Sequence, residues 1–236
     1  MEKRELLYEG KAKQIFATDD PDLVIVNYKD DATAYYGVKK SSIKDKGKMN
    51  CQISEILFKH LGKAGIRTHL VERLDECSLL CYKAKALPLE FIVRNVIAGS
   101  LSRRLDIQEG TVPQSPIYEI CLKSDTLRDP MINRYHVVAL GYTTSEVLDE
   151  IQLLLQKINS KLISLFKILD IDVIDFKVEF GFDKDGQLML IDEISPDTAR
   201  LWDCNTKNCL DSDRFRRDLG EVSEAYREVL ERLSSL

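Results

Sequence analysis

The stretch from Val173 to Asp203 constrains the fold more than any other part of this sequence. It reads VIDFKVEFGFDKDGQLMLIDEISPDTARLWD. Apolar and polar residues alternate over 174–181 and again over 188–194, which is the period of a strand. Asp185-Gly186, a dipeptide typical of tight turns, lies between the two runs. The sequence therefore predicts a β-hairpin followed by a charged loop.

The length of the hairpin turn decides which side chains share a face. With a turn of two or four residues, Lys177, Glu179 and Asp192 lie on one face, whereas a three-residue turn separates them. Two carboxylates beside one ammonium favour a further cation, and Mg²⁺ is typically held by one or two carboxylates with water and phosphate oxygens. A solvated face with a Lys–Glu pair is the alternative. The loop over 195–203 adds acids, an arginine and the only tryptophan, which favours a site.

Length and composition limit the class of protein. The 236 residues exceed one average domain and fall short of two, which predicts one compact unit with two lobes. A hydrophobic content of 44% with 31% charged residues is typical of a globular chain. The net charge of −5 argues against nucleic-acid binding driven by bulk charge. With no signal peptide and no apolar run near the ~18 residues of a membrane span, we expect a cytoplasmic protein without membrane contact. Six scattered cysteines without C-x₂-C spacing predict reduced thiols.

The N-terminal part of the chain is rich in predicted strands. Residues 6–16 read as two short strands joined at Gly10, and further strands are expected over 23–26, 68–74 and 78–85. The polar segment 30–49, with its lysines, reads as a solvated surface or flap. A helix with apolar residues at Ile53, Ile56, Leu57 and Leu61 follows it. Leu87-Pro88 ends the last of these strands and is the predicted boundary between lobes of residues 1–87 and 88–236.

The remaining segments alternate irregularly between strands and helices. Strands are expected over 90–96 and 118–123. A long helix is expected from a capping box of Thr143 and Glu146, and a final helix from Asp213, whose first turn carries Arg214, Arg216 and Arg217. The predicted fold class is therefore α/β (α+β), with two lobes of antiparallel sheets and flanking helices.

Some local patterns fit phosphate binding, each with a plainer alternative. Gly10 permits close approach of backbone amides to a phosphate, and Lys11 and Lys13 add charge, although solubilising lysines at a hairpin tip look the same. Gly99-Ser100 at a helix start, with Arg94 on the preceding strand, can bind an anion. A plain N-cap at Ser100 and a structural ion pair at Arg94 form the alternative.

Together these motifs resemble the SAICAR synthetase (phosphoribosylaminoimidazole-succinocarboxamide synthase) family over essentially the whole chain. The matching segments are YEGKAK at 8–13, KGKMN at 46–50, VRNVIAGS at 93–100, DFKVEFG at 175–181, DEISPDTARLWD at 192–203 and DRFRRDLG at 213–220. The resemblance implies a two-lobe fold related to ATP-grasp enzymes and kinases. It also implies an ATP- and Mg²⁺-dependent ligase, usually a homodimer in bacteria, that joins L-aspartate to the carboxylate of carboxyaminoimidazole ribonucleotide (CAIR), giving SAICAR, ADP and phosphate in purine biosynthesis.

The resemblance also implies roles for individual residues. Residues 83–88 would present backbone to adenine, and Glu179 and Asp192 would hold Mg²⁺. Nucleotide binding is assigned to Gly10, Lys11, Ala12, Lys13, Lys83, Ala86 and Lys123. Binding of the other substrates is assigned to Glu90, Arg94, Ser100, Asp129, Arg200 and Arg216. Catalytic roles are assigned to Lys177, Asp197 and Arg200.

The chain departs from the family pattern at two positions. Asn50 is followed by Cys51, where the family generally has a second asparagine, and Tyr36 precedes Gly37, where the family often has Asp or Asn. Both departures are expected to lie near the active-site flap.

Overall fold

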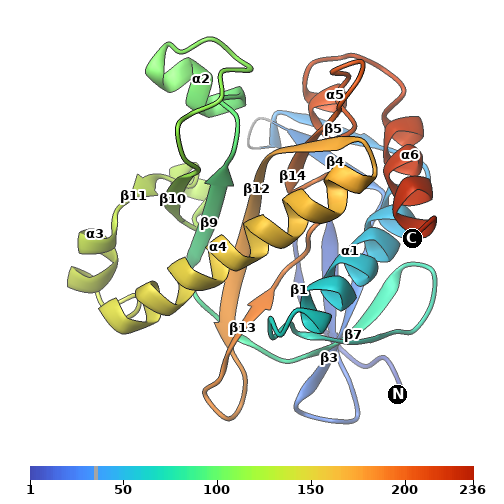
Figure 1. Cartoon of the computed structure of the whole chain (residues 1–236). Coiled ribbons are helices and arrows are strands. Elements are labelled where there is room, and N and C mark those ends of the chain that lie inside the picture. The colour runs from blue at the N-terminus through green and yellow to red at the C-terminus, as the bar shows by residue number, and fades with distance from the viewer. Residues whose placement is uncertain (35–36) are drawn as a thin grey trace.

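The structure, a computed structural model, describes residues 1–34 and 37–236. An antiparallel first sheet is built from the N-terminal part of the chain (Figure 1), and its strand order is β1-β2-β3-β7-β6. These strands are β1 (Leu6–Glu9), β2 (Lys13–Ala17), β3 (Leu23–Tyr28), β7 (Ser78–Tyr82) and β6 (Leu70–Arg73). The expected strands over 6–16 and 23–26 are thereby confirmed. A separate small ladder pairs β4 (Asp31–Ala34) with β5 (Lys39–Ser42).

The second sheet is organised around β12 (Ile171–Phe182), which is buried along most of its length. Its strands follow the order β11-β10-β9-β12-β13, with β14 and β8 also paired to β12. They are β11 (Met131–Ile132), β10 (Ile117–Leu122), β9 (Leu89–Arg94), β13 (Leu188–Ile191), β14 (Ala199–Asp203) and β8 (Lys85–Ala86). The expected charged loop over 195–203 is therefore partly wrong, because its second half pairs with β12 as a strand.

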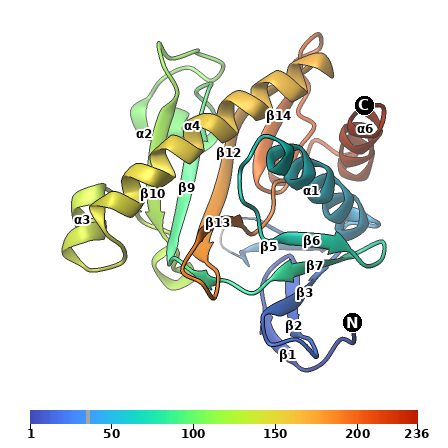
Figure 2. The ribbon, with the colours of Figure 1, turned by 60° about the horizontal axis from the view of Figure 1, so that its bottom comes forward.

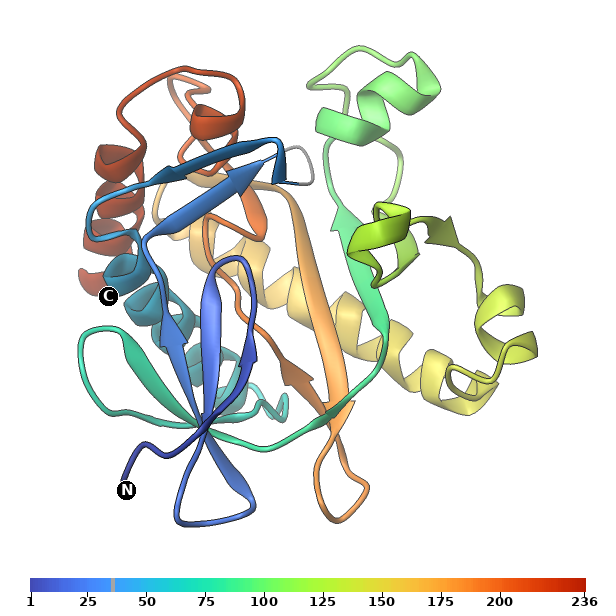
Figure 3. The same ribbon diagram turned by 180° about the vertical axis from the view of Figure 1, so that it is seen from behind.

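Helices cover these sheets on the side away from the N-terminus. The long helix α4 (Ser145–Ile168) crosses the second sheet, and α1 (Lys46–Lys63) packs between the first sheet and α6 (Val222–Ser234) (Figure 2). Shorter helices are α2 (Gly99–Leu105), the 3-10 helix η2 (Asp125–Leu127), α3 (Arg134–Ala139) and α5 (Asp213–Arg216). Viewed from behind, α2, η2 and α3 lie along one side of the molecule, beyond β9 (Figure 3). No helix of the described residues is long and apolar enough to cross a membrane.

One large apolar core joins the second sheet to the helices. Phe176, Val178 and Phe180 of β12 are fully buried against α4, whose buried side chains recur every three or four residues. Ile53 and Leu57 of α1 belong to the same cluster. A smaller cluster lies between the first sheet and α1. The division at residue 87 stays a prediction, although the chain passes from one sheet to the other between Tyr82 and Lys85.

Two helices differ from the prediction, one in its N-cap and the other in its length. Thr144, and not Thr143, is the N-cap of α4, because its side chain accepts a hydrogen bond from the Val147 amide at 3.4 Å. The expected single C-terminal helix is divided into α5 and α6. Gly220, with a φ of 72°, lies in the break.

Candidate active site

A cleft of about 1570 Å³ is lined by residues of both sheets. The first sheet contributes β2, β3 and the β1–β2 loop, and the second contributes β12 and the segment after β13. Most of the site residues predicted from the sequence line this cleft: Gly10, Lys11, Ala12, Lys13, Lys83, Ala86, Glu90, Lys123, Asp129, Lys177, Glu179, Asp192, Asp197 and Arg216. Arg94, Ser100 and Arg200 are not among its lining residues.

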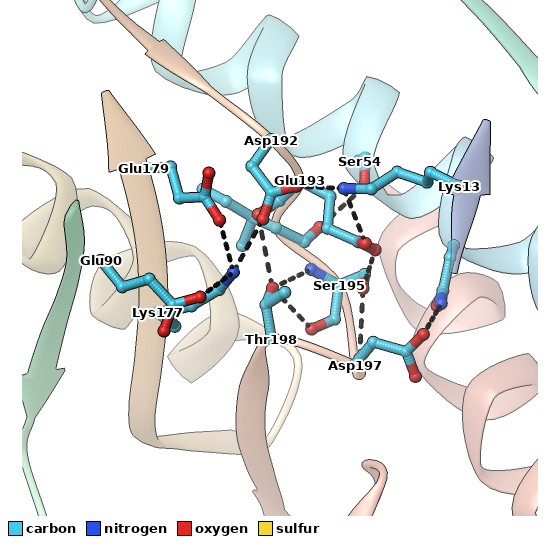
Figure 4. A network of polar contacts seen from close by, with 12 residues as sticks. Lys13, Ser54, Glu90, Lys177, Glu179, Asp192, Glu193, Ser195, Asp197 and Thr198 are labelled. Carbon is cyan, nitrogen blue, oxygen red and sulfur yellow. Dashed lines mark hydrogen bonds and ion pairs between the residues drawn. The ribbon is translucent and has the colours of Figure 1, made fainter. Parts of the chain in front are cut away.

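Lys177 lies at the centre of a cluster of carboxylates (Figure 4). Its Nζ donates to Glu179 and to Asp192, each at 2.9 Å, and lies 3.3 Å from Glu90. Burial alone would lower the pKa of Lys177, but the surrounding carboxylates outweigh it and hold that pKa well above its usual value. Burial raises the pKa of Glu90, and Lys177 offsets part of that shift. The predicted grouping of Lys177, Glu179 and Asp192 is therefore present.

The hairpin register that produces this grouping differs from the prediction. The turn holds three residues, because Phe182 pairs with Leu188 and the Asp183 amide donates to the Gln187 carbonyl at 3.1 Å. Gly186, with a φ of 74°, closes it. In this register Glu179 is opposite Ile191, so a regular strand would send the next side chain to the other face. Asp192 instead leaves the strand with a φ of 70°, which accounts for its return to Lys177.

Lys13 links the first sheet to this cluster. Its Nζ forms ion pairs with Asp192 and, at 2.9 Å, with Glu193. Burial alone would lower the pKa of Lys13, but the attraction of the two carboxylates is larger, so that its pKa is raised. Asp192 shows the converse, because Lys13 and Lys177 overcome the effect of burial and hold its pKa well below the usual range. Both partners therefore stay charged at neutral pH.

The residue types in this cluster fit a magnesium ion. Glu179 and Asp192 offer hard carboxylate oxygens on either side of the Lys177 ammonium, at a position that already attracts a cation. Among the described residues, no group of three or more His, Cys, Asp or Glu side chains is arranged to hold a metal. A two-carboxylate site suits Mg²⁺, which keeps several waters and takes phosphate oxygens as further ligands.

Further cations line the cleft near this cluster. Lys123 donates to Glu179 at 2.5 Å. Lys11, on the loop between β1 and β2, pairs with Asp125 of η2 at 2.5 Å, so this ion pair joins the two sides of the cleft. The same loop is closed by the Gly10 amide, which donates to the Lys13 carbonyl at 2.8 Å. Asp129, also in the cleft, accepts from the Ser124 amide at 2.9 Å.

Part of the cleft lining is apolar. It consists of side chains of β2, β3, the segment before β9 and the end of β13: Ile15, Val24, Val26, Ala86, Leu87 and Ile191. Lys83 belongs to the segment that connects the sheets, and its amide donates to the Asp22 carbonyl at 2.8 Å. Ala86 is held opposite Gly181 of β12. A flat apolar ligand group fits such surroundings better than a charged one.

Arg94 and Arg200 belong to a chain of alternating charges outside the cleft lining, and the Ser100 hydroxyl is hydrogen-bonded to it. Arg94 is 3% exposed and donates to Glu119 at 2.8 Å, to Asp175 at 3.0 Å and to Ser100 at 3.2 Å. The N-cap of α2 is Ala98, so Ser100 lies inside the helix and is not the expected cap.

Asp175 also accepts from Arg200 at 2.8 Å, which extends the chain towards the cleft. Arg200 also donates a hydrogen bond to Asp213 at 2.9 Å, and Asp213 accepts another from Arg216 at 2.7 Å. Arg216 is the member of this chain that lines the cleft. The arginines at the start of α5 are thus matched by an acidic neighbour.

The partners of Asp197 were not predicted from the sequence. Asp197 accepts from Tyr226 of α6 at 2.6 Å, from Asn50 of α1 at 2.9 Å, and from Lys46, which is 1% exposed. Burial would raise the pKa of Asp197, but Lys46 and the other donors lower it. Lys46 and Asn50 are four residues apart and so share one helix face, which was the available signal in the KGKMN motif. The expectation that 30–49 is entirely a solvated flap is therefore wrong at Lys46.

The two departures from the family pattern have different outcomes. Cys51 of α1 is fully buried in the smaller cluster, between this helix and the first sheet, and it does not line the cleft. Its expected place at an active-site flap is wrong, because consecutive residues of a helix point in different directions. Tyr36 lies outside the residues that the structure describes. All six cysteines are free thiols.

Comparisons with known proteins agree with this geometry. Residues 6–233 match the sequence profile of SAICAR synthetase. Phosphoribosylaminoimidazole-succinocarboxamide synthase of Clostridium beijerinckii is 54% identical over 234 residues, which are 99% of this chain and 100% of the relative.

Solved structures show the same fold. The synthase of Ehrlichia chaffeensis superposes with a TM-score of 0.96 at 44% identity, covering 98% of this chain and 99% of that one. A type-2 SAICAR synthetase in complex with ADP gives a TM-score of 0.95 at 46% identity, covering 98% of both chains. The chain therefore belongs to the SAICAR synthetase family.

Proposed function

We propose that this protein is an ATP-dependent ligase that joins L-aspartate to the carboxylate of CAIR, giving SAICAR, ADP and phosphate in purine biosynthesis. The observation that carries the proposal is the charged cluster around Lys177, which lies beside an apolar recess in one cleft. Membership of the SAICAR synthetase family and a relative solved with ADP support the choice of nucleotide and product.

The chemistry explains the concentration of cations in an acidic chain. A carboxylate is a poor acyl donor, so it needs activation, and phosphoryl transfer from ATP supplies a leaving group. Positioning and charge neutralisation do most of the work in such transfers. Lys11, Lys13 and Lys123 would hold the phosphates with the Ala12 amide, on the loop that Gly10 closes. Lys83 and Ala86 would flank the base.

Glu179 and Asp192 are the proposed Mg²⁺ ligands. The ion would neutralise charge on the phosphate oxygens and orient them for transfer. Lys177, between the two carboxylates, is proposed to hold the transferred group and the reacting carboxylate together. It can do so because its ammonium stays charged and is positioned by three acidic side chains.

The remaining site residues are proposed to bind the ribonucleotide and aspartate. The proposed role of Arg216 in substrate binding is supported by its place in the cleft lining. Arg200 would hold Arg216 in position through Asp213. Arg94 would in turn hold Arg200 through Asp175. Proposed contacts to substrate are completed by Glu90, Ser100, Asp129 and Arg200, with Asp197 in a catalytic role.

A cytoplasmic homodimer is the proposed working form. The substrates are small soluble metabolites, and ATP and CAIR are phosphorylated, which supports the compartment. Large apolar side chains exposed on and near α3 and α4, including Tyr135, Leu140 and Leu153, support a covered surface. A strand-rich nucleotide lobe of residues 1–87 and a substrate lobe of 88–236 are supported by the separate sheets.

The test is ADP release by the purified protein with Mg²⁺, ATP, CAIR and L-aspartate, omitting each component in turn. We expect full turnover only with all four, and a product whose mass is that of SAICAR. Release of ADP without CAIR, or with another acceptor in its place, would show a kinase or ligase with a different substrate. Nucleotide binding without any turnover would show a silent nucleotide-binding module.

A further inference from the structure

Asp211 lies in the segment between β14 and α5, and it is 0% exposed. Its Oδ2 accepts a hydrogen bond from the Leu201 amide of β14 at 2.8 Å. Its Oδ1 accepts another from the Asp213 amide, at the start of α5, at 2.7 Å. One buried carboxyl group therefore joins the main chains of the strand and the helix.

The two amides belong to the parts of the main chain that carry Arg200 and Arg216. Leu201 directly follows Arg200 on β14, and Asp213 begins the helical turn that ends at Arg216. The side chains of both arginines donate to Asp213, at 2.9 and 2.7 Å. Asp211 thus holds the main chain on which these ion pairs are built, and Arg216 is the one of these residues that lines the cleft.

The groups that face Asp211 come from four parts of the chain. Burial and the negative charge of Asp213 raise the pKa of Asp211 to about 7, and the two amides and Arg200 of β14 offset only part of that rise. Cys209, in the segment before α5, and Tyr226 of α6 are the other titratable neighbours, and Asp211 contributes to the raised pKa of each. Both protonation states of Asp211 are therefore populated at neutral pH.

The ionised state of Asp211 holds the two amides more tightly. A hydrogen bond to a carboxylate is stronger than one to a neutral carboxyl group. The two amide hydrogen bonds accordingly act to lower the pKa of Asp211, which means that they favour the ionised form. When this carboxyl takes up a proton, the start of α5 is held less firmly against β14.

We propose that Asp211 is a positioning residue for the ribonucleotide, which aligns Arg216 for binding by holding the start of α5 against β14. The inference rests on the proposed function, because it takes Arg216 to bind CAIR. Asp211 acts through its neighbours and not by contact with the substrate, since it is fully buried and is not among the residues that line the cleft.

The test is the substitution Asp211→Asn, with CAIR binding measured by calorimetry and with KM and kcat measured by turnover. Asparagine keeps the shape, but it offers one acceptor oxygen for two amides and turns an NH₂ group towards the other. We expect both the Kd and the KM for CAIR to rise about tenfold. The kcat and the affinity for ADP should stay close to those of the unchanged protein, as for a loss of substrate binding alone.

Asp203→Asn is the matched control, at the end of the same strand. Asp203 is also buried and also accepts from two main-chain amides, those of Asn205 and Thr206. This variant should lose stability, as Asp211→Asn does, and bind CAIR as well as the unchanged protein. If Asp211→Asn binds CAIR normally, or if both variants lose the same affinity, Asp211 has a structural role alone and the proposal is overturned.

The pH dependence of KM for CAIR gives a second measurement. In the unchanged protein KM should fall as pH rises, with a midpoint near 7, because Asp211 ionises there. A phosphate monoester loses its second proton near pH 6, so its own contribution is centred about one unit lower. The component near pH 7 should be missing in Asp211→Asn. If that variant does not fold, a KM of the unchanged protein that is constant from pH 6.5 to 8 overturns the proposal.

Binding and turnover separate this inference from the proposed function. Normal SAICAR synthesis, with CAIR binding that Asp211→Asn leaves unaltered, would remove the role of Asp211 alone. About tenfold weaker CAIR binding in this variant, in a protein that forms no SAICAR, would leave the role of Asp211 intact and remove the proposed reaction.

Discussion

Asp192 links the two sheets within the charged cluster. It pairs with Lys13 from the first sheet and with Lys177 from the second, and it is a proposed Mg²⁺ ligand. Asp192→Asn keeps the shape and also tolerates the positive φ, since asparagine adopts left-handed backbone readily. We expect kcat to fall by about a hundredfold or more, with a weaker dependence on Mg²⁺ and unchanged far-UV circular dichroism.

The fold should survive this substitution because the two lysines keep other partners. Lys13 retains Glu193, and Lys177 retains Glu179. Asp185→Asn, in the exposed hairpin turn, is the control and should leave kcat unchanged. Unaltered turnover and Mg²⁺ dependence in Asp192→Asn would remove Asp192 from the metal site.

The ionisation of Asp213 should make the free energy of unfolding depend on pH. Burial would raise its pKa, but Arg200 and Arg216 lower it to about 2, against an ordinary value of 3.8. The folded state therefore binds this proton less tightly than the unfolded state, and the stabilisation is present above about pH 4 and lost as pH falls towards 2. It amounts to about 2 kcal/mol at pH 7.

Urea unfolding of Asp213→Asn at a series of pH values measures this effect. The difference in free energy of unfolding from the unchanged protein should be largest near pH 7 and shrink as pH falls from 4 to 2. Asp218→Asn, whose carboxylate is largely exposed, is the control. A difference that stays constant with pH would contradict the assignment to ionised Asp213.

Helix α1 shows how one element can serve both the core and the site. Its apolar residues pack against the core, while Lys46 and Asn50 at its start hold Asp197. Lys46→Met leaves a buried carboxylate without its ammonium, so we expect a loss of about 3–5 kcal/mol in the free energy of unfolding. Chemical denaturation measures this loss, and nucleotide turnover should fall with it because Asp197 loses its orientation.

Lys48→Met is the matched control on the same helix. Lys48 pairs with Glu76 at the surface, where Lys48 is partly exposed and Glu76 largely exposed, so its removal should leave stability within experimental error. Equal stability of the two variants would mean that the Lys46–Asp197 pair contributes nothing to holding α1 against the segment after β13.

Sequence periodicity predicted the strands and helices better than the turns that connect them. The strands around Gly10, the strand 174–181 and the stripe of α4 all follow from spacing, because burial on one face leaves a regular mark. The three-residue hairpin turn could not be predicted, since Lys184, Asp185 and Gly186 fit turns of several lengths. The lysines over 39–48 look alike in sequence, and tertiary contacts alone distinguish buried Lys46 from partly exposed Lys48.

At the scale of the whole molecule, the cleft depends on both sheets at once. A nucleotide that contacts Lys13 on one side and Glu179 on the other is bound by the folded protein and not by the unfolded chain. At a hundred times its Kd, ADP should add about 2.7 kcal/mol of stability. For a chain of this size the corresponding rise in Tm is about 5–10 °C.

Differential scanning calorimetry with and without ADP and Mg²⁺ measures this shift. We expect one transition in both cases, because the apolar core joins α1 to the second sheet. A second transition that ADP leaves unmoved would indicate that the two sheets unfold separately, and would argue for independent lobes.

Whether a site residue lines the cleft could be predicted from the sequence for some residues and not for others. Side chains that reach the ligand, such as Lys13 and Asp192, belong to short motifs that carry recognisable chemistry. Arg94 and Arg200 belong to such motifs as well, yet the structure engages both in ion pairs with Asp175, and neither is among the residues that line the cleft. Sequence spacing cannot separate direct contact from support through a neighbour, because that depends on how distant segments pack.

The ion pair between Lys11 and Asp125 has a consequence for the exchange of nucleotide. It joins the β1–β2 loop to η2, and both residues line the cleft. Because the two side chains are largely exposed, dissolved salt screens their attraction. The rate at which ADP dissociates from the protein should therefore rise with ionic strength. The salt concentration would then contribute to the turnover rate of the enzyme.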